Sequence, residues 1–395
     1  MSKILEGVRV IDISTFQAAP FCCQILADFG AEVIRVEPPG GAIDRELGPF
    51  ALNGENFAVS MYGRNKNGIT LNLKSVKGKQ ILKTLVKKSD VVVTNLTPRA
   101  VRSLGINYES LIESNPSLIY ASITGYGQYG PYAERPGFDP IAQAISGHMY
   151  ITGFKDGTPT KSGSSLTDYG AGLYGAIGIL LAIIHRNKTG EGQEIDVALL
   201  DSGVSFMEAV FSQYTVLNEI QPQMGNSRPF SAPTDAYRCK DGYIYLAVSF
   251  NRMWKRFTKL IGREDLADDP RFMNSELRRR NRDYMNSLTE GWLADKTRHE
   301  AVSLLVDAGI PAGPVNTVTE TFVDPQINAR EMIVNLKHPG VGEIPVSGIV
   351  VKLSKTPGSI ETPVPSVGQH NEEIYCGLLG YSKKELSELK KEGVV

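Results

Sequence analysis

The carboxylate of Asp168 is the group in this sequence best placed to do chemistry. It follows a run of small polar residues, 162–167, and precedes a segment, 169–184, that carries no charge. A helix over that segment would place Gly172, Gly175 and Gly178 on one face. Another backbone could approach this face closely, because glycine has no side chain. We expect Asp168 at the N-cap of this helix, ionised and held by the helix dipole and the unpaired N–H groups. Asp168 is then either a helix cap or a nucleophile, because aspartate serves in both roles.

Two glycine-rich stretches resemble nucleotide-binding motifs but lack the context that these motifs need. The stretch 125–130 has the spacing G-x-G-x-x-G, but Pro131 and Pro136 follow where a dinucleotide fold begins a helix. The stretch 63–68 has P-loop spacing, but Ile69 and Thr70 stand where lysine and serine or threonine are required. None of the five histidines lies in a metal-binding motif. We therefore expect no nucleotide cofactor and no metal.

Strand and helix patterns alternate through the first part of the chain. Helices are predicted over 20–29 and 76–87, a turn at Asn67-Gly68, and strands over 8–13, 32–36, 69–73, 91–93, 118–123 and from 194. This alternation predicts an α/β fold, in which a mostly parallel sheet carries helices on both faces. The uncharged segment 169–184 is shorter than the ~20 residues of a membrane span, so we expect a buried core helix.

The later part of the chain has a different pattern. A linker rich in Gly, Asn, Ser and Pro covers 221–233, and a hairpin with its turn at Asp241-Gly242 follows. Helices are predicted over 275–293 and 299–307, a strand over 348–353, and a last helix that starts with the capping box 382–385. We expect a large α/β domain over 1–220, a small α+β domain over 221–323 and a C-terminal part over 324–395.

The overall composition favours a soluble globular protein of the cytoplasm. A formal net charge of −1 gives no sign of a nucleic-acid partner. The four cysteines form no C-x-x-C pair and are expected to be reduced thiols. The N-terminus runs directly into a predicted strand without the apolar core of a signal peptide, and no membrane association is expected.

Several stretches, in this order, resemble the class III CoA-transferases, the family of formyl-CoA transferase and crotonobetainyl-CoA:carnitine CoA-transferase. They are Leu5 to Asp12, Gln17 to Pro20, Phe29 to Pro38, Asn65-Lys66 with Leu71 to Lys74, Ser122 to Gly127, Thr167 to Ala176, His185 to Val197, and Gly368 to Asn371. The resemblance implies a Rossmann-like large domain to which the C-terminal part returns. It also implies a ring-like chain that interlocks with a second copy in a homodimer.

The resemblance places the catalytic aspartate of the family at Asp168. It implies that Gln17 lies at the active site, where its amide is a candidate donor to an oxyanion, and Asp139 is a candidate to orient the acceptor or tune Asp168. The substrates would be an acyl-CoA and a free carboxylic acid, with coenzyme A as the carried group. By position, the CoA contacts of the family fall on Gln17, Ala18, Leu71, Asn72, Lys74, Asn95, Leu96, Thr97, Arg102 and Arg135.

Departures from the family pattern limit what can be carried over. Pro38 stands where formyl-CoA transferase has an arginine at the CoA, and Pro136 stands where it has a lysine. Neighbouring Arg35 and Arg135 are the candidates to replace those contacts. Arg102 and Arg135 are equally well interpreted as solvated surface charges.

Two other functions remain open. The related alpha-methylacyl-CoA racemases need two bases on opposite faces of the alpha carbon, and they supply a histidine within Gly-His-Asp. This chain has Gly137-Phe138-Asp139, and phenylalanine cannot move a proton, so transfer is favoured over racemisation. A non-catalytic CoA-binding protein is the second alternative, although it would not need the intact motif around Asp168. The sequence favours a short carboxylic or dicarboxylic acid as the acceptor without naming it.

Overall fold

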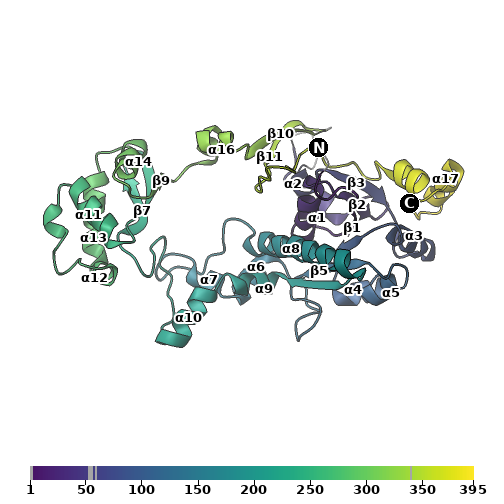
Figure 1. Cartoon of the computed structure of the whole chain (residues 1–395), viewed down its shortest axis with the longest axis horizontal. Coiled ribbons are helices and arrows are strands. Elements are labelled where there is room, and N and C mark those ends of the chain that lie inside the picture. The colour runs from purple at the N-terminus through teal and green to yellow at the C-terminus, as the bar shows by residue number, and fades with distance from the viewer. Residues whose placement is uncertain (1–2, 52–56, 58–59, 339) are drawn as a thin grey trace. The chain divides into compact units, whose positions relative to one another are not determined.

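The chain forms two compact units in a computed structural model that describes residues 3–51, 57, 60–338 and 340–395 (Figure 1). The larger unit comprises Met1–His148, Ser162–Glu208 and Pro325–Val395, and the smaller comprises Met149–Lys161 and Ala209–Asp324. The C-terminal segment thus belongs to the larger unit from residue 325, next to the expected boundary at 324. The first boundary lies at Glu208 and not at 220, and residues 149–161 join the smaller unit.

A six-stranded parallel sheet forms the centre of the larger unit, in the order β3-β2-β1-β4-β5-β6. Ile11 of the central strand pairs with Ile34 on one side and with Val92 on the other. Apolar runs buried on both faces are typical of parallel strands, which is why the sequence pattern revealed them. The strands are β1 (Arg9–Ile13), β2 (Glu32–Glu37), β3 (Lys66–Thr70), β4 (Val91–Thr94), β5 (Ile119–Thr124) and β6 (Glu194–Ala198).

Helices cover both faces of this sheet, as predicted. On one face α1 (Ala18–Asp28) and α8 (Leu166–Thr189) pack together over Val10, Val93 and Ile123. The other face carries a second core cluster, which includes Ile11, Val36 and Tyr375. Its helices are α3 (Val76–Val86), α4 (Pro98–Leu104), α5 (Tyr108–Ile112), the single π-turn η3 (Glu373–Leu378) and α17 (Lys383–Lys391). The predicted capping box of α17 is present, with reciprocal bonds between Ser382 and Glu385.

The glycines of α8 allow the close approach that their spacing predicted. A Cβ on Gly172 would lie 2.7 Å from the carbonyl oxygen of Ala18, and one on Gly175 would lie 2.4 Å from Cδ1 of Ile123. Neither distance is tolerated by a real side chain, so α8 lies against α1 and β5 only because these positions lack one. At 24 residues, α8 is longer than predicted and is the one helix of the described ranges that could span a membrane by length and composition. Half of its apolar window is buried inside the protein.

The outer edge of β3 departs from the prediction. Asn67 and Gly68 lie within the strand and do not form a turn, because they pair with Ile34 and Arg35 of β2, while the segment 362–371 runs along the outer edge. His370 N donates to the Gly68 carbonyl over 2.9 Å, and Gly68 N donates to His370 Nδ1 over 3.0 Å. A Cβ on Gly68 would come within 2.9 Å of Pro365, so glycine serves close approach here. His370 is a structural hydrogen-bonding residue.

Short elements complete the larger unit. The predicted strand at 348–353 is wrong, because the chain forms an antiparallel hairpin from β10 (Ile333–His338) and β11 (Gly342–Ser347) just before it. Gly348 N then donates to the Met332 carbonyl and ends the hairpin. The other elements are η1 (Ile43–Glu46), α2 (Ser60–Gly63), α6 (Asp139–Ile145), α7 (His148–Ile151), which continues into the smaller unit, α9 (Leu199–Ser205) and α16 (Pro325–Ala329).

The smaller unit has its own core and an α+β composition. Its three-stranded antiparallel sheet consists of β7 (Thr234–Cys239), β8 (Gly242–Ala247) and β9 (Ala312–Pro314). Trp254, Phe257 and Met285 pack in its core. The predicted helix over 275–293 is divided at Asn281 into α12 and α13. The helices are α10 (Glu208–Leu217), α11 (Asn251–Leu260), η2 (Glu264–Leu266), α12 (Ser275–Arg280), α13 (Arg282–Leu293), α14 (Arg298–Asp307) and α15 (Val318–Val323).

Candidate active site

The candidate site lies at the carboxyl ends of β1 and β4 in the larger unit. In the strand order 3-2-1-4-5-6 these two neighbours are the switch point, where the chain changes direction across the sheet. The helix after β1 joins one core cluster and the helix after β4 joins the other, so the loops 14–17 and 95–97 diverge. Open α/β sheets bind ligands in the crevice that this divergence leaves.

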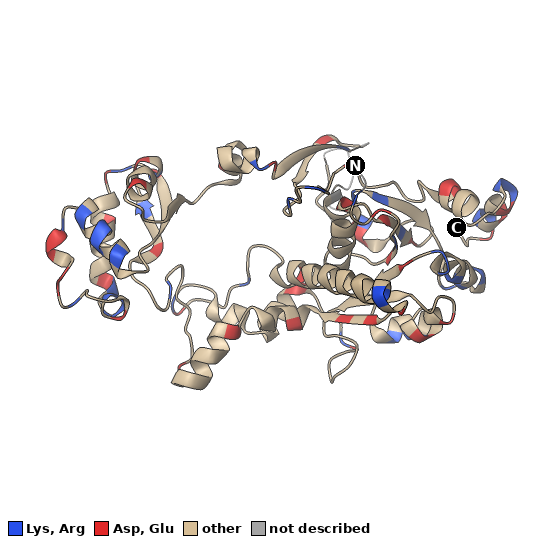
Figure 2. Ribbon diagram, viewed as in Figure 1, with Lys and Arg blue, Asp and Glu red and all other residues tan. Residues whose placement is uncertain are grey.

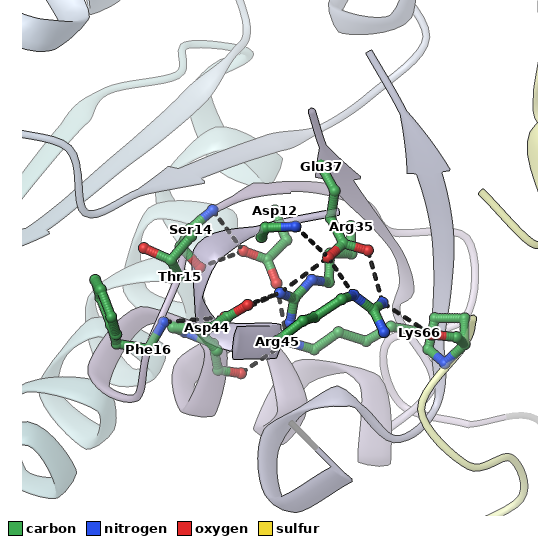
Figure 3. A network of polar contacts seen from close by, with 12 residues as sticks. Asp12, Ser14, Thr15, Phe16, Arg35, Glu37, Asp44, Arg45 and Lys66 are labelled. Atoms are coloured by element: carbon green, nitrogen blue, oxygen red, sulfur yellow. Dashed lines mark hydrogen bonds and ion pairs between the residues drawn. The ribbon is translucent and has the colours of Figure 1, made fainter. Parts of the chain in front are cut away.

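Three side chains from separate elements hold the backbone of the loop 14–17, and Figure 3 shows two of them, Asp12 and Asp44. Ser14 N donates to Asp12 over 3.1 Å, Thr15 N donates to Asn95 over 3.1 Å, and Phe16 N donates to Asp44 over 3.1 Å. Asn95 also donates to the Thr15 carbonyl over 2.6 Å. Phe16 has a left-handed φ of 66°. Gln17 follows as the N-cap of α1, half-buried.

Asp168 lies in the first turn of α8 but not at its N-cap. The helix begins at Leu166, after Ser165, so Asp168 is its third residue. Its side chain is half-buried, and in the described ranges it makes no hydrogen bond or ion pair. Burial, and secondly the charge of Asp139, raise the pKa of Asp168 from its ordinary 3.8 to about 7. The expectation of a capping, fully ionised carboxylate is therefore wrong, because burial opposes the charge that the helix start favours.

Asp139 supplies the cap that Asp168 does not. It is buried at the start of α6, and its Oδ1 accepts hydrogen bonds from the N–H of Thr167 over 2.7 Å and from the Thr167 hydroxyl over 2.8 Å. Its Oδ2 accepts from Gln143 over 2.7 Å. Asp139 therefore satisfies an N–H group in the first turn of α8 and places a negative charge next to Asp168.

Three cavities with shared lining residues surround the loop 14–17. The central cavity, about 300 Å³, is lined by residues that include Gln17, Ala18, Asn95, Leu96, Thr97, Phe138 and Asp168. The acid cavity, about 190 Å³, shares Phe16, Gln17 and Asp168 with it and is completed by Arg35, Asp44, Leu47, Met61 and Tyr62. The β3 cavity, about 430 Å³, shares Thr15 and Leu96 with the central cavity and includes Leu71, Asn72, Lys74 and Gly393.

Most of the residues predicted to contact CoA line these cavities. Gln17, Ala18 and the stretch 95–97 lie in the central cavity, and Leu71, Asn72 and Lys74 lie in the β3 cavity. Lys74 is exposed and makes no ion pair in the described part of the chain. Pro38 lines the β3 cavity and Pro136 the central one, so the two departures from the family pattern fall at these cavities.

The predicted arginines lie elsewhere. Arg102 is exposed and forms an ion pair with Glu134. Arg135 is exposed, with its guanidinium 3.7 Å from the centre of the Tyr132 ring. Neither is among the residues that line the cavities, which favours their interpretation as surface charges.

A buried ion-pair network backs the acid cavity (Figure 3). Arg35 Nη2 donates to the two oxygens of Asp44 over 2.7 and 2.9 Å and lies 3.2 Å from Glu37. Arg45 completes the network with a bond of 2.6 Å to Glu37. Arg35 therefore pairs with carboxylates of the protein, and the expectation that it replaces a CoA-binding arginine is not supported. Asp44 and Tyr62 were not predicted as site residues, and no motif marked them.

Phe138 occupies the position where the racemases carry a histidine. It is 55% exposed, lines the central cavity and packs edge-on against Phe16 at a ring distance of 5.5 Å. An apolar ring thus stands beside Asp168 where a second base would be needed. The G-x-G-x-x-G stretch follows β5 and leads into turns, and helix α6 begins only at Asp139. The helix start that would meet a pyrophosphate is not present there.

Comparison with known proteins agrees with this geometry. The model of CoA-transferase family III matches residues 5–371. Succinyl-CoA–D-citramalate CoA-transferase of Chloroflexus aurantiacus is 35% identical over 99% of this chain and 98% of its own. Formyl-CoA:oxalate CoA-transferase of Streptomyces avermitilis is 35% identical over the whole of both chains.

The fold is likewise that of a solved relative. A CaiB/BaiF family protein from Brucella suis superimposes with a TM-score of 0.85, at 33% identity, over 96% of this chain and all of its own. The family match covers nearly the whole chain, so the resemblance found in the short motifs extends to the complete fold. The chain belongs to CoA-transferase family III and is a CoA-transferase.

Proposed function

We propose that this enzyme moves CoA between an acyl-CoA and a short carboxylic or dicarboxylic acid, with Asp168 as the nucleophile. The observation that carries the proposal is the position of Asp168 between the acid cavity and the central cavity, without a partner for its carboxylate in the described residues. A carboxylate that neither caps its helix nor pairs with a cation remains available to attack a thioester.

The reaction would proceed through two covalent states of Asp168. The carboxylate attacks the thioester carbonyl, forms an acyl-aspartyl anhydride and releases CoA as a thiolate. The thiolate then attacks the aspartyl carbonyl, which forms an aspartyl-CoA thioester and frees the first acid. The acceptor carboxylate attacks this thioester, releases the thiolate and forms a new anhydride. Attack of the thiolate on the acyl carbonyl gives the new acyl-CoA and restores Asp168.

Gln17 is the proposed oxyanion donor. It lines both cavities together with Asp168, and its side chain makes no hydrogen bond in the described part of the structure. Each tetrahedral intermediate carries a negative oxygen, and a donor fixed in advance stabilises it more than mobile water does. Asp139 would act on Asp168 only through its charge and through the start of α8, because it is 4% exposed.

The cavities suggest where each part of the substrate lies. CoA would occupy the central and β3 cavities, with Lys74 near a phosphate, and the acyl group would extend into the acid cavity. About 190 Å³ is room for a small acid only. The names of the relatives, which include succinyl-CoA, citramalate and oxalate, support a short dicarboxylic acid.

We also propose a homodimer of interlocked ring-like chains in the cytoplasm, without a metal or nucleotide cofactor. Support for a partner comes from the outer face of α8, where Leu173, Ile177, Leu181 and Ile184 are each at least 50% exposed. Figure 2 shows most of this helix without charge. A contiguous apolar face of this kind is typical of an interface. Light scattering after gel filtration tests the dimer, and a monomer at micromolar concentration would reject it.

Trapping of the covalent state tests the central proposal. Purified enzyme is incubated with a panel of acyl-CoA donors and hydroxylamine, and the peptides are analysed by mass spectrometry. We expect a hydroxamate at Asp168 with the donor that supports transfer to an acid. Asp196→Asn serves as the control, since this carboxylate lies outside all three cavities. Transfer without modification of Asp168 would reject covalent catalysis.

A further inference from the structure

The conformation of Phe16 requires an external constraint. Its φ of 66° lies in the left-handed region, which non-glycine residues and aromatic residues in particular rarely adopt. Phe16 is also followed directly by Gln17, which lines both cavities together with Asp168. The backbone at Phe16 therefore sets the direction in which Gln17 enters the site.

Asp44 is the side chain that constrains Phe16. It is buried, and its Oδ2 accepts the Phe16 N–H over 3.1 Å. The neighbouring residue Thr15 is held at both its N–H and its carbonyl by Asn95, at 3.1 and 2.6 Å. With Thr15 and Phe16 fixed from two different elements, the peptide that leads into Gln17 has little freedom to relax.

The position of Asp44 is fixed in turn by charges (Figure 3). Both of its oxygens accept from Arg35 Nη2, at 2.7 and 2.9 Å, and Arg35 is 1% exposed on β2 of the central sheet. Arg35 also contacts Glu37, which Arg45 binds at 2.6 Å. This chain of contacts connects a rigid strand with a strained loop.

We propose that Asp44 is a positioning residue for the transfer reaction: by accepting the Phe16 N–H it holds the loop in its left-handed conformation and directs Gln17 toward Asp168. The proposal rests on the proposed function. Asp44 lines the acid cavity, but both of its oxygens accept bonds from Arg35 and Phe16, and it lies outside the two cavities proposed for CoA, so it would not bind the acyl-CoA directly. Its loss should therefore lower kcat and leave the KM for acyl-CoA unchanged.

Two substitutions of Asp44 separate positioning from charge pairing. Asp44→Asn and Asp44→Leu both remove the charge that pairs with Arg35, and both keep the branched shape of the side chain. Only asparagine retains an oxygen that can accept the Phe16 N–H. We expect kcat to fall roughly hundredfold in Asp44→Leu, as for a misplaced catalytic group, and several-fold at most in Asp44→Asn. The KM for acyl-CoA should remain within about twofold in both.

Arg45→Gln is the matched control. It removes another charge from the same network, but Arg45 binds Glu37 and the Pro365 carbonyl, whereas the Phe16 N–H is bound by Asp44. The Tm of Arg45→Gln should change as much as that of Asp44→Asn, while its kcat stays near wild type.

Two outcomes would overturn the positioning role. One is an equal loss of kcat in Asp44→Asn and Asp44→Leu, and the other is a loss of kcat in Arg45→Gln that follows its loss of stability. If Asp44→Leu does not fold, Asp44→Ala takes its place, and equal kcat in Asp44→Ala and Asp44→Asn overturns the proposal in the same way. A wild-type enzyme that transfers no CoA to any acid would instead reject the proposed function.

Discussion

The acid cavity and the β3 cavity differ in how their charged side chains are paired and exposed. Around the acid cavity, Arg35 pairs with Asp44 and Glu37 away from solvent, and the carboxylate of Asp168 is left without a partner among the described residues. Around the β3 cavity the lining is mostly apolar, the lining carboxylate Glu37 is paired with arginines, and the ammonium of Lys74 is exposed. A reacting group gains from a fixed, dry environment, whereas a phosphate needs only an accessible cation. We therefore expect substitutions at the first cavity to change kcat and those at the second to change KM.

The largest effect should come from Asp168→Asn. An amide cannot form the anhydride, so kcat should fall by several orders of magnitude. The substitution should not destabilise the helix start, since Asp168 does not cap α8. Its pKa of about 7 in the folded protein exceeds the ordinary 3.8, so the carboxyl group stabilises the fold below pH 4, and that stability is lost as the pH rises through 7.

Asp168→Asn should consequently be inactive and yet have a higher Tm than wild type at pH 8. Its advantage should disappear near pH 4, where Asp168 is protonated in the folded protein. Activity assays and thermal unfolding at both pH values check this. A variant that is nearly fully active would remove Asp168 from the chemistry.

A smaller effect is expected from Asp139→Asn, which probes the second cause of the raised pKa. In wild type, kcat/KM should rise with pH with an apparent pKa of about 7, because the nucleophile must be ionised. Loss of the Asp139 charge should lower this apparent pKa, by less than the full shift because burial is the larger cause, while the asparagine oxygen can still accept from Thr167.

The pH profile of Asp196→Asn provides the matched comparison for Asp139→Asn. Asp196 also accepts a backbone N–H, from Gln128 over 2.9 Å, and lies outside the three cavities. Its profile should coincide with that of wild type. Identical profiles for all three enzymes would show that Asp139 does not tune Asp168.

At the β3 cavity, Lys74→Ala should raise the KM for acyl-CoA about tenfold with kcat unchanged, the loss expected for one charge-assisted phosphate contact. Arg102→Ala and Arg135→Ala should change this KM by less than about twofold, because both side chains are exposed and engaged on the protein surface. Steady-state kinetics with the active donor measures all three. Equal KM values for Lys74→Ala and Arg102→Ala would exclude Lys74 from the CoA site.

For exchange of the alpha proton of an acyl-CoA we expect no activity. With Phe138 beside Asp168, no second base stands at the position that the racemases use. A 2-methylacyl-CoA incubated with the enzyme in deuterated water should keep its alpha proton, as followed by proton NMR. Rapid exchange would support the racemase alternative.

Local patterns predicted the sheet and the helix that carries Asp168, but not its position within the first turn or its environment. Buried parallel strands are apolar runs, so β1, β2, β4 and β5 could be predicted from the sequence alone. The cap of α8 could not, because Asp139 provides it from 28 residues before Thr167. Asn67-Gly68 was wrongly predicted as a turn, because the strand there is formed by pairing with β2 on one side and by contacts with His370 on the other, neither of which is local in the sequence.

The ion-pair network could not be predicted from the sequence for a similar reason. Asp44 meets Arg35 and Phe16 across separate elements, and such pairs leave no periodic signal. The motif resemblance located Gln17 and the stretch 95–97, which do line the central cavity. It also suggested Arg102 and Arg135, which the structure places outside the cavity linings, because position in an alignment does not report where a long side chain points.

The discontinuous larger unit has a consequence for biosynthesis. All six strands have been synthesised once residue 198 is made, and the helices α1 and α8 of one face precede that point. The opposite face still lacks Ile374, Tyr375, Leu386 and Leu389, which arrive only after the entire smaller unit has been translated. During that interval the nascent chain exposes apolar sheet surface, so its yield in cells should depend on chaperones that bind such surfaces until translation finishes.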